Sequence, residues 1–353
     1  MAPVPNTLNP LELIARRWQP SARLVRQAAL ATVVMAVIIV ITGGAVRLTQ
    51  SGLGCSTWPK CTPDSLTPTS AMGINGLVEF GNRALTGVLC VVVGAFIIAA
   101  RARHPRRRSL TRLGWAQFWI VMLNAVVGGI TVLTGLNPYI VSSHFLASTA
   151  LLTVAVLSWK RAGEGDEEPR DLVARPVRQL AWLLVLAAGA LTVIGTIVTG
   201  TGPHAGDATK LDHRIPLDWR EITQLHVDFA YIVVGLAVAL WFTLRAVKAP
   251  AAARRHLLEL FGCIAFQGVV GYVQYFNGLP EFVIELHMTG SALLWVAVLR
   301  VFLSLRDRGP LLDDGDAALA EPSEETAQQA TREPSEQGTV PAQPTAGTSA
   351  SSR

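Results

Sequence analysis

The chain has 353 residues, of which 50% are hydrophobic and only 16% are charged. Soluble domains carry nearer a quarter charged residues, so this composition excludes an ordinary soluble protein. The formal net charge of +5 comes from Lys and Arg that gather in alternate loops between apolar blocks. The positive charge therefore reflects the tendency of Lys and Arg to lie in the cytoplasmic loops of membrane proteins, and we do not interpret it as a nucleic-acid-binding feature.

Eight apolar blocks that lack Asp, Glu, Lys and Arg follow one another along the chain. With its less polar flanks, each can supply the roughly 20 residues that cross about 30 Å of hydrocarbon. The sixth and eighth blocks are the shortest and need the preceding turns, at Glu221 and Phe282, to reach that length. The eight predicted transmembrane helices contain residues 28–46, 84–100, 113–133, 139–159, 179–202, 229–244, 260–280 and 286–299.

Lys and Arg residues are concentrated in the N-terminal segment and in the second, fourth and sixth loops. The first and fifth loops carry fewer, with Arg47 and Lys60 in the first. Because positive residues stay on the cytoplasmic side, this asymmetry predicts that both termini lie inside the cell. No cleavable signal is evident, since the first apolar run is long and lacks a small-residue cleavage site.

The third and fourth blocks repeat as the seventh and eighth. A gapless shift of 143 positions places residues 125–148 on residues 268–291, so that Gly128 meets Gly271 and His144 meets His287. Each half then holds four helices, and an even number leaves both copies in the same orientation, related by an axis along the membrane normal. We predict an all-α integral membrane protein built from two pseudo-twofold related four-helix bundles.

Three histidines and one asparagine occupy equivalent positions, because a shift of 144 also places Asn82 on His226. All four lie about five to eight residues inside helices entered from the outer face, roughly 8–12 Å deep. Two imidazoles at one depth on facing helices can bind the iron of a haem. A lone histidine near a helix end is often only a hydrogen-bonded core residue. Ionisable groups inside membrane helices are usually functional, however, and the duplicated spacing favours ligation by His226 and His287.

The composition divides the chain into segments. Beyond the last apolar block it is rich in Pro, Glu, Gln, Ser, Thr and Ala, which cannot bury enough apolar area to order the chain. We predict a cytoplasmic N-terminal segment at 1–25, an N-terminal half at 26–160, a cytoplasmic linker at 161–177, a C-terminal half at 178–305 and a disordered cytoplasmic tail at 306–353.

Six motifs appear in order along the predicted helices: TGGAVRLTQSGLGCSTWPKC, EFGNR, SSHFLAS, TGPHAGD, QLHVDFAY and ELHMTGS. In this order they resemble the haem A synthase family, membrane enzymes that oxidise a methyl group of haem O to the formyl group of haem A. The resemblance covers residues 28–304. It implies a haem b cofactor between His226 and His287, and a substrate haem O in the N-terminal half, held by His144.

The second helix departs from the family pattern Glu-x-x-His-Arg. Glu79 and Arg83 match this pattern, but Asn82 replaces the histidine. Since Asn is a poor iron ligand, the resemblance implies that His144, alone or with water, binds the substrate iron. Arg47 and Arg83 are candidate partners of the haem propionates.

Glu79 shares a helical face with Asn82 and Arg83. A carboxylate at the rim of a low-dielectric pocket can relay protons or direct water during methyl oxidation. We therefore predict a catalytic role for Glu79, and the alternative is a structural Glu79–Arg83 pair.

Cysteines occur in two settings. Cys55 and Cys61 flank STWPK in the first outer loop, an oxidising location where a disulfide persists. A structural bridge and a redox role in haem handling both stay open for this pair. Cys90 and Cys263 lie in helices and are predicted to be packing residues.

The combined prediction is a multi-pass haem A synthase in a bacterial-type cytoplasmic membrane, surrounded by lipid. Its implied partners are a haem O synthase upstream and a haem-copper oxidase downstream. One alternative is a di-haem b-type carrier that moves electrons from a quinol to an outer acceptor, against which Asn82 argues. A transporter is the other alternative, but the Gly and Pro residues gather at helix ends and not near the midplane.

Overall fold

The computed structural model describes residues 17–203, 205 and 214–311. The predicted C-terminal tail lies outside these residues from position 312 onward, as do most of the predicted N-terminal segment and part of the TGPHAGD motif. Within the described residues, eight helices are long and apolar enough to cross a membrane. The prediction of an all-α membrane protein with eight spanning helices is therefore confirmed.

Each helix overlaps its predicted block. The second spanning helix begins 11 residues before its block, and the seventh begins nine residues before its block and ends four residues before the block does. α7 begins at Trp219 and α9 at Glu281, so both short blocks gain the extra turn that the sequence required. The helices are α2 Ala22–Leu48, α3 Gly73–Ala102, α4 Arg108–Leu133, α5 Pro138–Ala162, α6 Arg175–Thr201, α7 Trp219–Ala246, α8 Ala251–Phe276 and α9 Glu281–Leu303, with a short 3-10 turn, η1, at Ser70–Met72.

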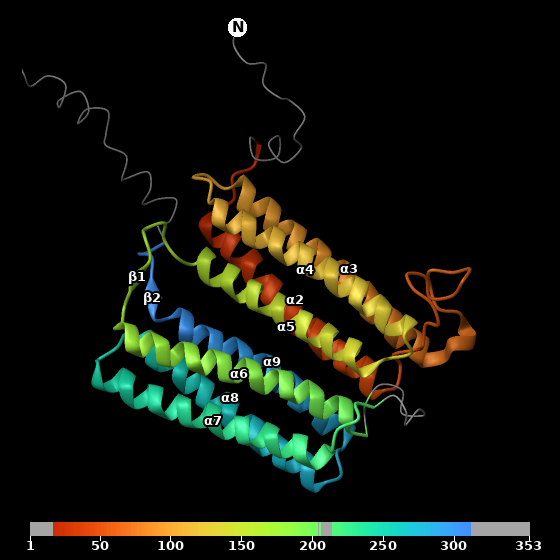
Figure 1. Ribbon diagram of the computed structural model, residues 1–353. Coiled ribbons are helices and arrows are strands. Elements are labelled where there is room, and N and C mark those ends of the chain that lie inside the picture. Colours follow the sequence, from red (N-terminus) through yellow and green to blue (C-terminus); the bar gives the residue numbers. More distant parts are fainter. Residues whose placement is uncertain (1–16, 204, 206–213, 312–353) are drawn as a thin grey trace, which may run out of the picture. The chain divides into compact units, whose positions relative to one another are not determined.

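Two very short strands were not predicted. β1, Arg170–Asp171, pairs antiparallel with β2, Arg306–Asp307. They tie the segment after α5 to the segment after α9 and lie at the left end in Figure 1. The connection between α2 and α3, residues 49–69, projects at the opposite end and contains Cys55 and Cys61. We call residues 49–69 the disulfide loop, because these two cysteines are bonded to each other.

The duplicated Gly-Leu pair forms the same turn twice. Gly135 and Leu136 have φ of 61° and 61°, and Gly278 and Leu279 have φ of 72° and 63°. The Leu136 amide donates to the carbonyl oxygen of Thr131 at 2.9 Å, and the Leu279 amide donates to the carbonyl oxygen of Gln274 at 2.8 Å. Left-handed residues of this kind end a helix, and glycine adopts them without steric cost. The sequence repeat therefore corresponds to a repeat in local structure.

In the described part of the chain the eight long helices form two groups of four, which lie side by side in Figure 1. In the first group α2, α3, α4 and α5 pack in a ring, each against the next and α5 against α2. In the second group α6, α7, α8 and α9 pack in the same order, with α9 against α6. Helix α9 also packs against α2 and α5, and α5 packs against α6, so that these helices join the groups.

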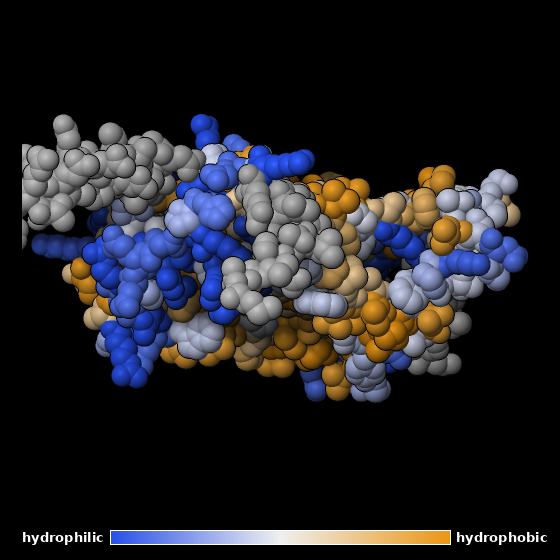
Figure 2. Space-filling view, turned by 90° about the horizontal axis from the view of Figure 1, so that it is seen from above, coloured by the Kyte–Doolittle hydropathy of each residue, from blue (hydrophilic) through white to orange (hydrophobic). Residues whose placement is uncertain are grey.

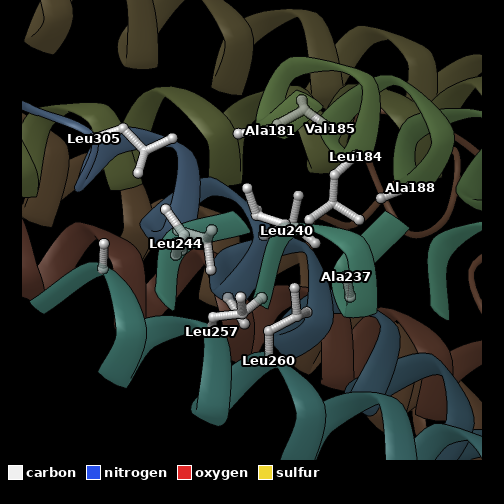
Figure 3. Close-up of a cluster of buried hydrophobic side chains, with 14 of the residues drawn as sticks. Ala181, Leu184, Val185, Ala188, Ala237, Leu240, Leu244, Leu257, Leu260 and Leu305 are labelled. Atoms are coloured by element: carbon white, nitrogen blue, oxygen red, sulfur yellow. The ribbon is translucent and has the colours of Figure 1, made fainter. Parts of the chain in front are cut away.

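The core of the second group consists of aliphatic side chains. Figure 3 shows Leu184 of α6, Leu240 and Leu244 of α7 and Leu257 and Leu260 of α8 converging between the helices, and all five are fully buried. In a bilayer such contacts stabilise the bundle through close packing, because lipid tails are as apolar as leucine. On the surface seen in Figure 2, hydrophobic residues cover the middle and hydrophilic residues gather toward the ends, as a spanning protein requires.

Candidate functional site

The second bundle brings two histidine rings together. His226 lies on α7, seven residues after its first residue, and His287 lies on α9, six residues after its first residue. Their ring centroids are 6.3 Å apart and their planes are inclined by 65°. Metal–imidazole bonds are about 2 Å long, so this separation leaves room for one metal ion between the rings. A pair of axial nitrogens suits a macrocycle, which supplies its own equatorial ligands.

Each of the three membrane histidines lies against a glycine of the preceding helix. A Cβ added at Gly195 would be 3.0 Å from Cε1 of His226, and one added at Gly128 would be 3.1 Å from Cε1 of His144. At Gly271 the corresponding distance to Cε1 of His287 is 3.6 Å. We call these three residues the ring-facing glycines. Because they lack side chains, the imidazoles can lie beside the neighbouring helix.

The first bundle contains a cavity of about 320 Å³, which falls within the range of roughly 300–1,000 Å³ of ligand pockets. We call it the N-terminal cavity. Its walls come from α2, α3, α4, α5, the disulfide loop and one residue of α9, Met288. The predicted substrate-site residues all line it, namely Arg47, Glu79, Asn82, Arg83 and His144.

Asn82 is held by α2. The Thr42 hydroxyl donates a hydrogen bond of 2.8 Å to Oδ1 of Asn82. This contact uses the amide oxygen, so the amide NH2 is the group that Asn82 can offer to the cavity. Asn82 also lies nine residues after the start of α3, whereas His144 lies six residues after the start of α5. The depth of Asn82 thus exceeds the predicted range slightly, and His144 is the imidazole among the cavity-lining residues.

Glu79 is buried and joins α3 to the disulfide loop. Its Oε2 accepts a hydrogen bond of 2.7 Å from the Cys55 amide, and its Oε1 pairs with Arg83. Arg83 in turn donates to the carbonyl oxygens of Thr57 at 3.0 Å and Lys60 at 3.3 Å. The pair therefore positions the loop that the disulfide closes. Glu79 lines the N-terminal cavity as well, and it is the carboxylate among the lining residues.

The disulfide loop also supplies part of the cavity wall. Trp58 and Pro59 line the cavity. The Trp58 indole lies so close to Gly129 of α4 that any side chain at position 129 would collide with it. Trp58 belongs to the first sequence motif and Gly129 to the repeated stretch, residues 125–148. Their contact joins segments about 70 positions apart, and periodicity gives no signal for such a contact.

Helix α9 borders both regions. His287 faces His226 in the second bundle, while the adjacent Met288 lines the N-terminal cavity of the first. Arg47 of α2 adds a second link between the bundles by donating to the carbonyl oxygen of Thr199 on α6 at 3.2 Å. The two histidine regions are thus neighbours across a single helix.

Comparison with known proteins gives the family of this chain. A model of the COX15-CtaA family, described as cytochrome oxidase assembly protein, matches residues 26–299. The chain belongs to this family. As a COX15-CtaA member with eight spanning helices, it is a multi-pass protein of the cell membrane.

Several relatives of this COX15-CtaA chain carry the name heme A synthase. The protein of Staphylococcus saprophyticus subsp. saprophyticus is 26% identical over 231 residues, which are 62% of this chain and 73% of the relative. That of Staphylococcus epidermidis is 29% identical over 225 residues, 56% of this chain and 72% of the relative. That of Geobacillus kaustophilus is 32% identical over 118 residues, 33% of this chain and 36% of the relative.

Proposed function

We propose that this protein is a haem A synthase, which oxidises a methyl group of haem O to a formyl group and so supplies haem A for oxidase assembly. The observation that carries this proposal is the pairing of two unlike sites across α9. One has two facing histidines, and the other is a cavity with a single histidine beside a carboxylate and two arginines. The names of the relatives agree with this activity.

In the second bundle we assign haem b to His226 and His287. Nδ1 of His287 is buried without a hydrogen-bond partner, and Cε1 and Nδ1 are the ring atoms nearest the ring-facing glycine in both cases. That edge of each ring faces a helix, which leaves Nε2 as the nitrogen for the iron. Bound there, haem b would accept and pass on single electrons. Two fixed ligands suit a cofactor that stays in place.

In the first bundle we assign haem O to the N-terminal cavity, with His144 as its iron ligand. One histidine is compatible with a substrate that must enter and leave. The NH2 group of Asn82 is a hydrogen-bond donor toward the bound molecule, and Arg47 and Arg83 are the cations for its propionates. Arg83 is already engaged by the protein, since it donates two hydrogen bonds to the disulfide loop and pairs with Glu79.

The chemistry requires water, a proton acceptor and an electron acceptor. Conversion of the methyl group to formyl with water as the oxygen source, through an alcohol-level species, releases four electrons and four protons. Glu79 is the carboxylate that lines the cavity, and we propose that it accepts protons from water at the methyl carbon. Haem b held by His226 and His287 would supply a one-electron acceptor on the other side of α9, since His287 and Met288 are adjacent residues in the two sites.

We further propose the membrane orientation that the basic loops predict, with both ends of the chain in the cytoplasm and the disulfide loop outside. The two ring-like bundles then correspond to the halves at 26–160 and 178–305. A haem O synthase is the proposed supplier, because a farnesylated haem is nearly insoluble in water, and a haem-copper oxidase is the proposed consumer.

The test is haem extraction from protein purified after co-expression with a haem O synthase. We expect haem A and haem b from the wild type, and haem b without haem A from His144→Ala. His256→Ala is the matched control, because His256 pairs with Glu259 on α8, outside both sites. Haem b alone from every form would contradict the proposal and favour the di-haem electron carrier.

A further inference from the structure

The outward surface of α7 and α8 carries polar groups within the membrane-spanning helices. Gln224, Asp228 and Tyr231 lie on the exposed face of α7, where the Gln224 amide donates to Asp228 at 2.8 Å. Tyr272 of α8 lies 3.2 Å from Tyr231, hydroxyl to hydroxyl. These tyrosines are 60% and 58% exposed. We call the four residues the polar patch.

The patch lies at the depth of the proposed haem b site. Tyr231 is twelve residues after Trp219, about 18 Å along α7, and its side chain leans back toward the outer end. Tyr272 is four residues before the outer end of α8 and leans inward. The two hydroxyl groups therefore meet near the level of His226, which is about 10 Å along α7. Asp228 is only two residues from His226.

Beneath the two tyrosines both helices present glycine. Gly235 follows Tyr231 by one turn on α7, and Gly268 precedes Tyr272 by one turn on α8. A Cβ added at either position would meet open space. Helices α7 and α8 also contact each other less extensively than their counterparts α3 and α4. Because no side chains project from these two glycines, a flat ring or an isoprenoid chain can lie against the helices next to the hydroxyl pair.

An aromatic belt at the outer helix ends accounts for part of this surface, since Tyr272 stacks on Phe276, but it does not account for Asp228. Trp219, Tyr275 and Phe276 lie at the outer helix ends, where aromatic residues anchor a protein at the membrane interface. Asp228 lies deeper, and a carboxylate facing hydrocarbon is costly unless it serves a function. Exposed hydrogen-bonding groups at this depth call for a polar partner that is itself dissolved in the bilayer.

We propose that the polar patch binds a membrane quinone, which takes the electrons that leave haem b. This inference rests on the proposed function, whose reaction needs an acceptor for four electrons. The balance is R–CH3 + H2O + 2 quinone → R–CHO + 2 quinol, with two electrons and two protons added to each quinone. One tyrosine hydroxyl donates to a quinone carbonyl oxygen while it accepts from the other tyrosine, and Asp228 and Gln224 bind the hydroxyl group of the quinol. The protons come from water at the outer face.

The experiment uses the haem-loaded protein in mild detergent. Haem b is reduced with one equivalent of dithionite without oxygen, mixed with decylubiquinone, and its oxidation is followed by stopped-flow absorbance. The double variant Tyr231→Phe/Tyr272→Phe removes two hydroxyl groups and little else. Tyr275→Phe is the control, since Tyr275 is similarly exposed, at 54%, but lies outside the patch. Unchanged haem b content in each variant verifies that the protein is folded.

We expect a rate that saturates with quinone in the wild type and in the control, and a rate at least tenfold lower in the double variant at the same quinone concentration. A rate that does not saturate, or equal rates in all three proteins, overturns the proposal. A further result would also overturn the proposal: the wild type is a dimer, the double substitution dissociates it, and the quinone reaction does not change. In that case a second copy of the chain, and not a quinone, would cover the patch. Haem A formation is measured separately. Haem A without quinone reactivity overturns the quinone site alone, and quinone reactivity without haem A overturns the proposed enzyme.

Discussion

Substitution of the ring-facing glycines tests the haem b assignment most directly. Gly195→Ala would place a Cβ 3.0 Å from Cε1 of His226, whereas Gly271→Ala would place one 3.6 Å from Cε1 of His287. Favourable carbon–carbon contacts are about 3.5–4.0 Å long. The first variant therefore forces the ring or the helix to move by about 0.5 Å, and the second requires no movement. Both changes raise helix propensity equally, so that contribution cancels.

The expected cost follows from that displacement. A functional site must hold its groups within about 0.5 Å, and disturbing residues that orient metal ligands typically lowers affinity by about 10–100-fold. We expect Gly195→Ala to weaken haem b binding by that factor, about 1.4–2.8 kcal/mol, and Gly271→Ala to bind as the wild type does.

The assay measures haem b per protein by the pyridine haemochromogen method, before and after incubation with excess apomyoglobin as a haem acceptor. Gly195→Ala should lose haem to the acceptor much faster than Gly271→Ala. Equal retention by the two variants would refute the assignment, as would greater loss from Gly271→Ala, because the order of the two contacts would then have no bearing on haem binding.

Three further changes probe other contacts. Asn82→His should add a second axial ligand in the N-terminal cavity, giving a two-histidine absorption spectrum and slower haem A formation; an unchanged spectrum would contradict the placement of Asn82 beside the substrate iron. Glu79→Gln should keep the disulfide loop in place yet lower haem A formation at least tenfold, whereas full activity would leave Glu79 only its structural contacts with Cys55 and Arg83. Arg107→Ala should lower the free energy of unfolding by about 2–4 kcal/mol, because the buried Arg107 guanidinium donates to the carbonyl oxygens of Arg161, Glu164 and Gly165. The loss should appear as a lower melting temperature in detergent, and an unchanged melting temperature would exclude that role.

Hydropathy alone was enough to predict the eight helices, because the bilayer imposes their length and apolar character. The repeat predicted more. It matched His144 with His287 and Gly128 with Gly271, and both glycines lie against those histidine rings. It also matched the Gly-Leu turns that end α4 and α8. These features are local or follow helical spacing.

Other contacts of the site could not be predicted. The bond from the Cys55 amide to Glu79 and the packing of Trp58 on Gly129 depend on how the disulfide loop folds over the bundle. The hydrogen bond from Thr42 to Asn82 depends on the register between α2 and α3. The pairing of β1 with β2 joins segments on either side of the second bundle. Such contacts arise from tertiary packing, which periodicity does not encode.

The position of α9 would couple the proposed haem b centre to the neighbouring N-terminal cavity. His287 and Met288 are consecutive residues, so a molecule that displaces Met288 when it enters the N-terminal cavity also strains the helix that carries an axial ligand. Arrival and departure of substrate should therefore change the absorption and redox potential of the proposed haem b. The absorption spectrum of the permanently bound cofactor would then report whether substrate occupies the N-terminal cavity.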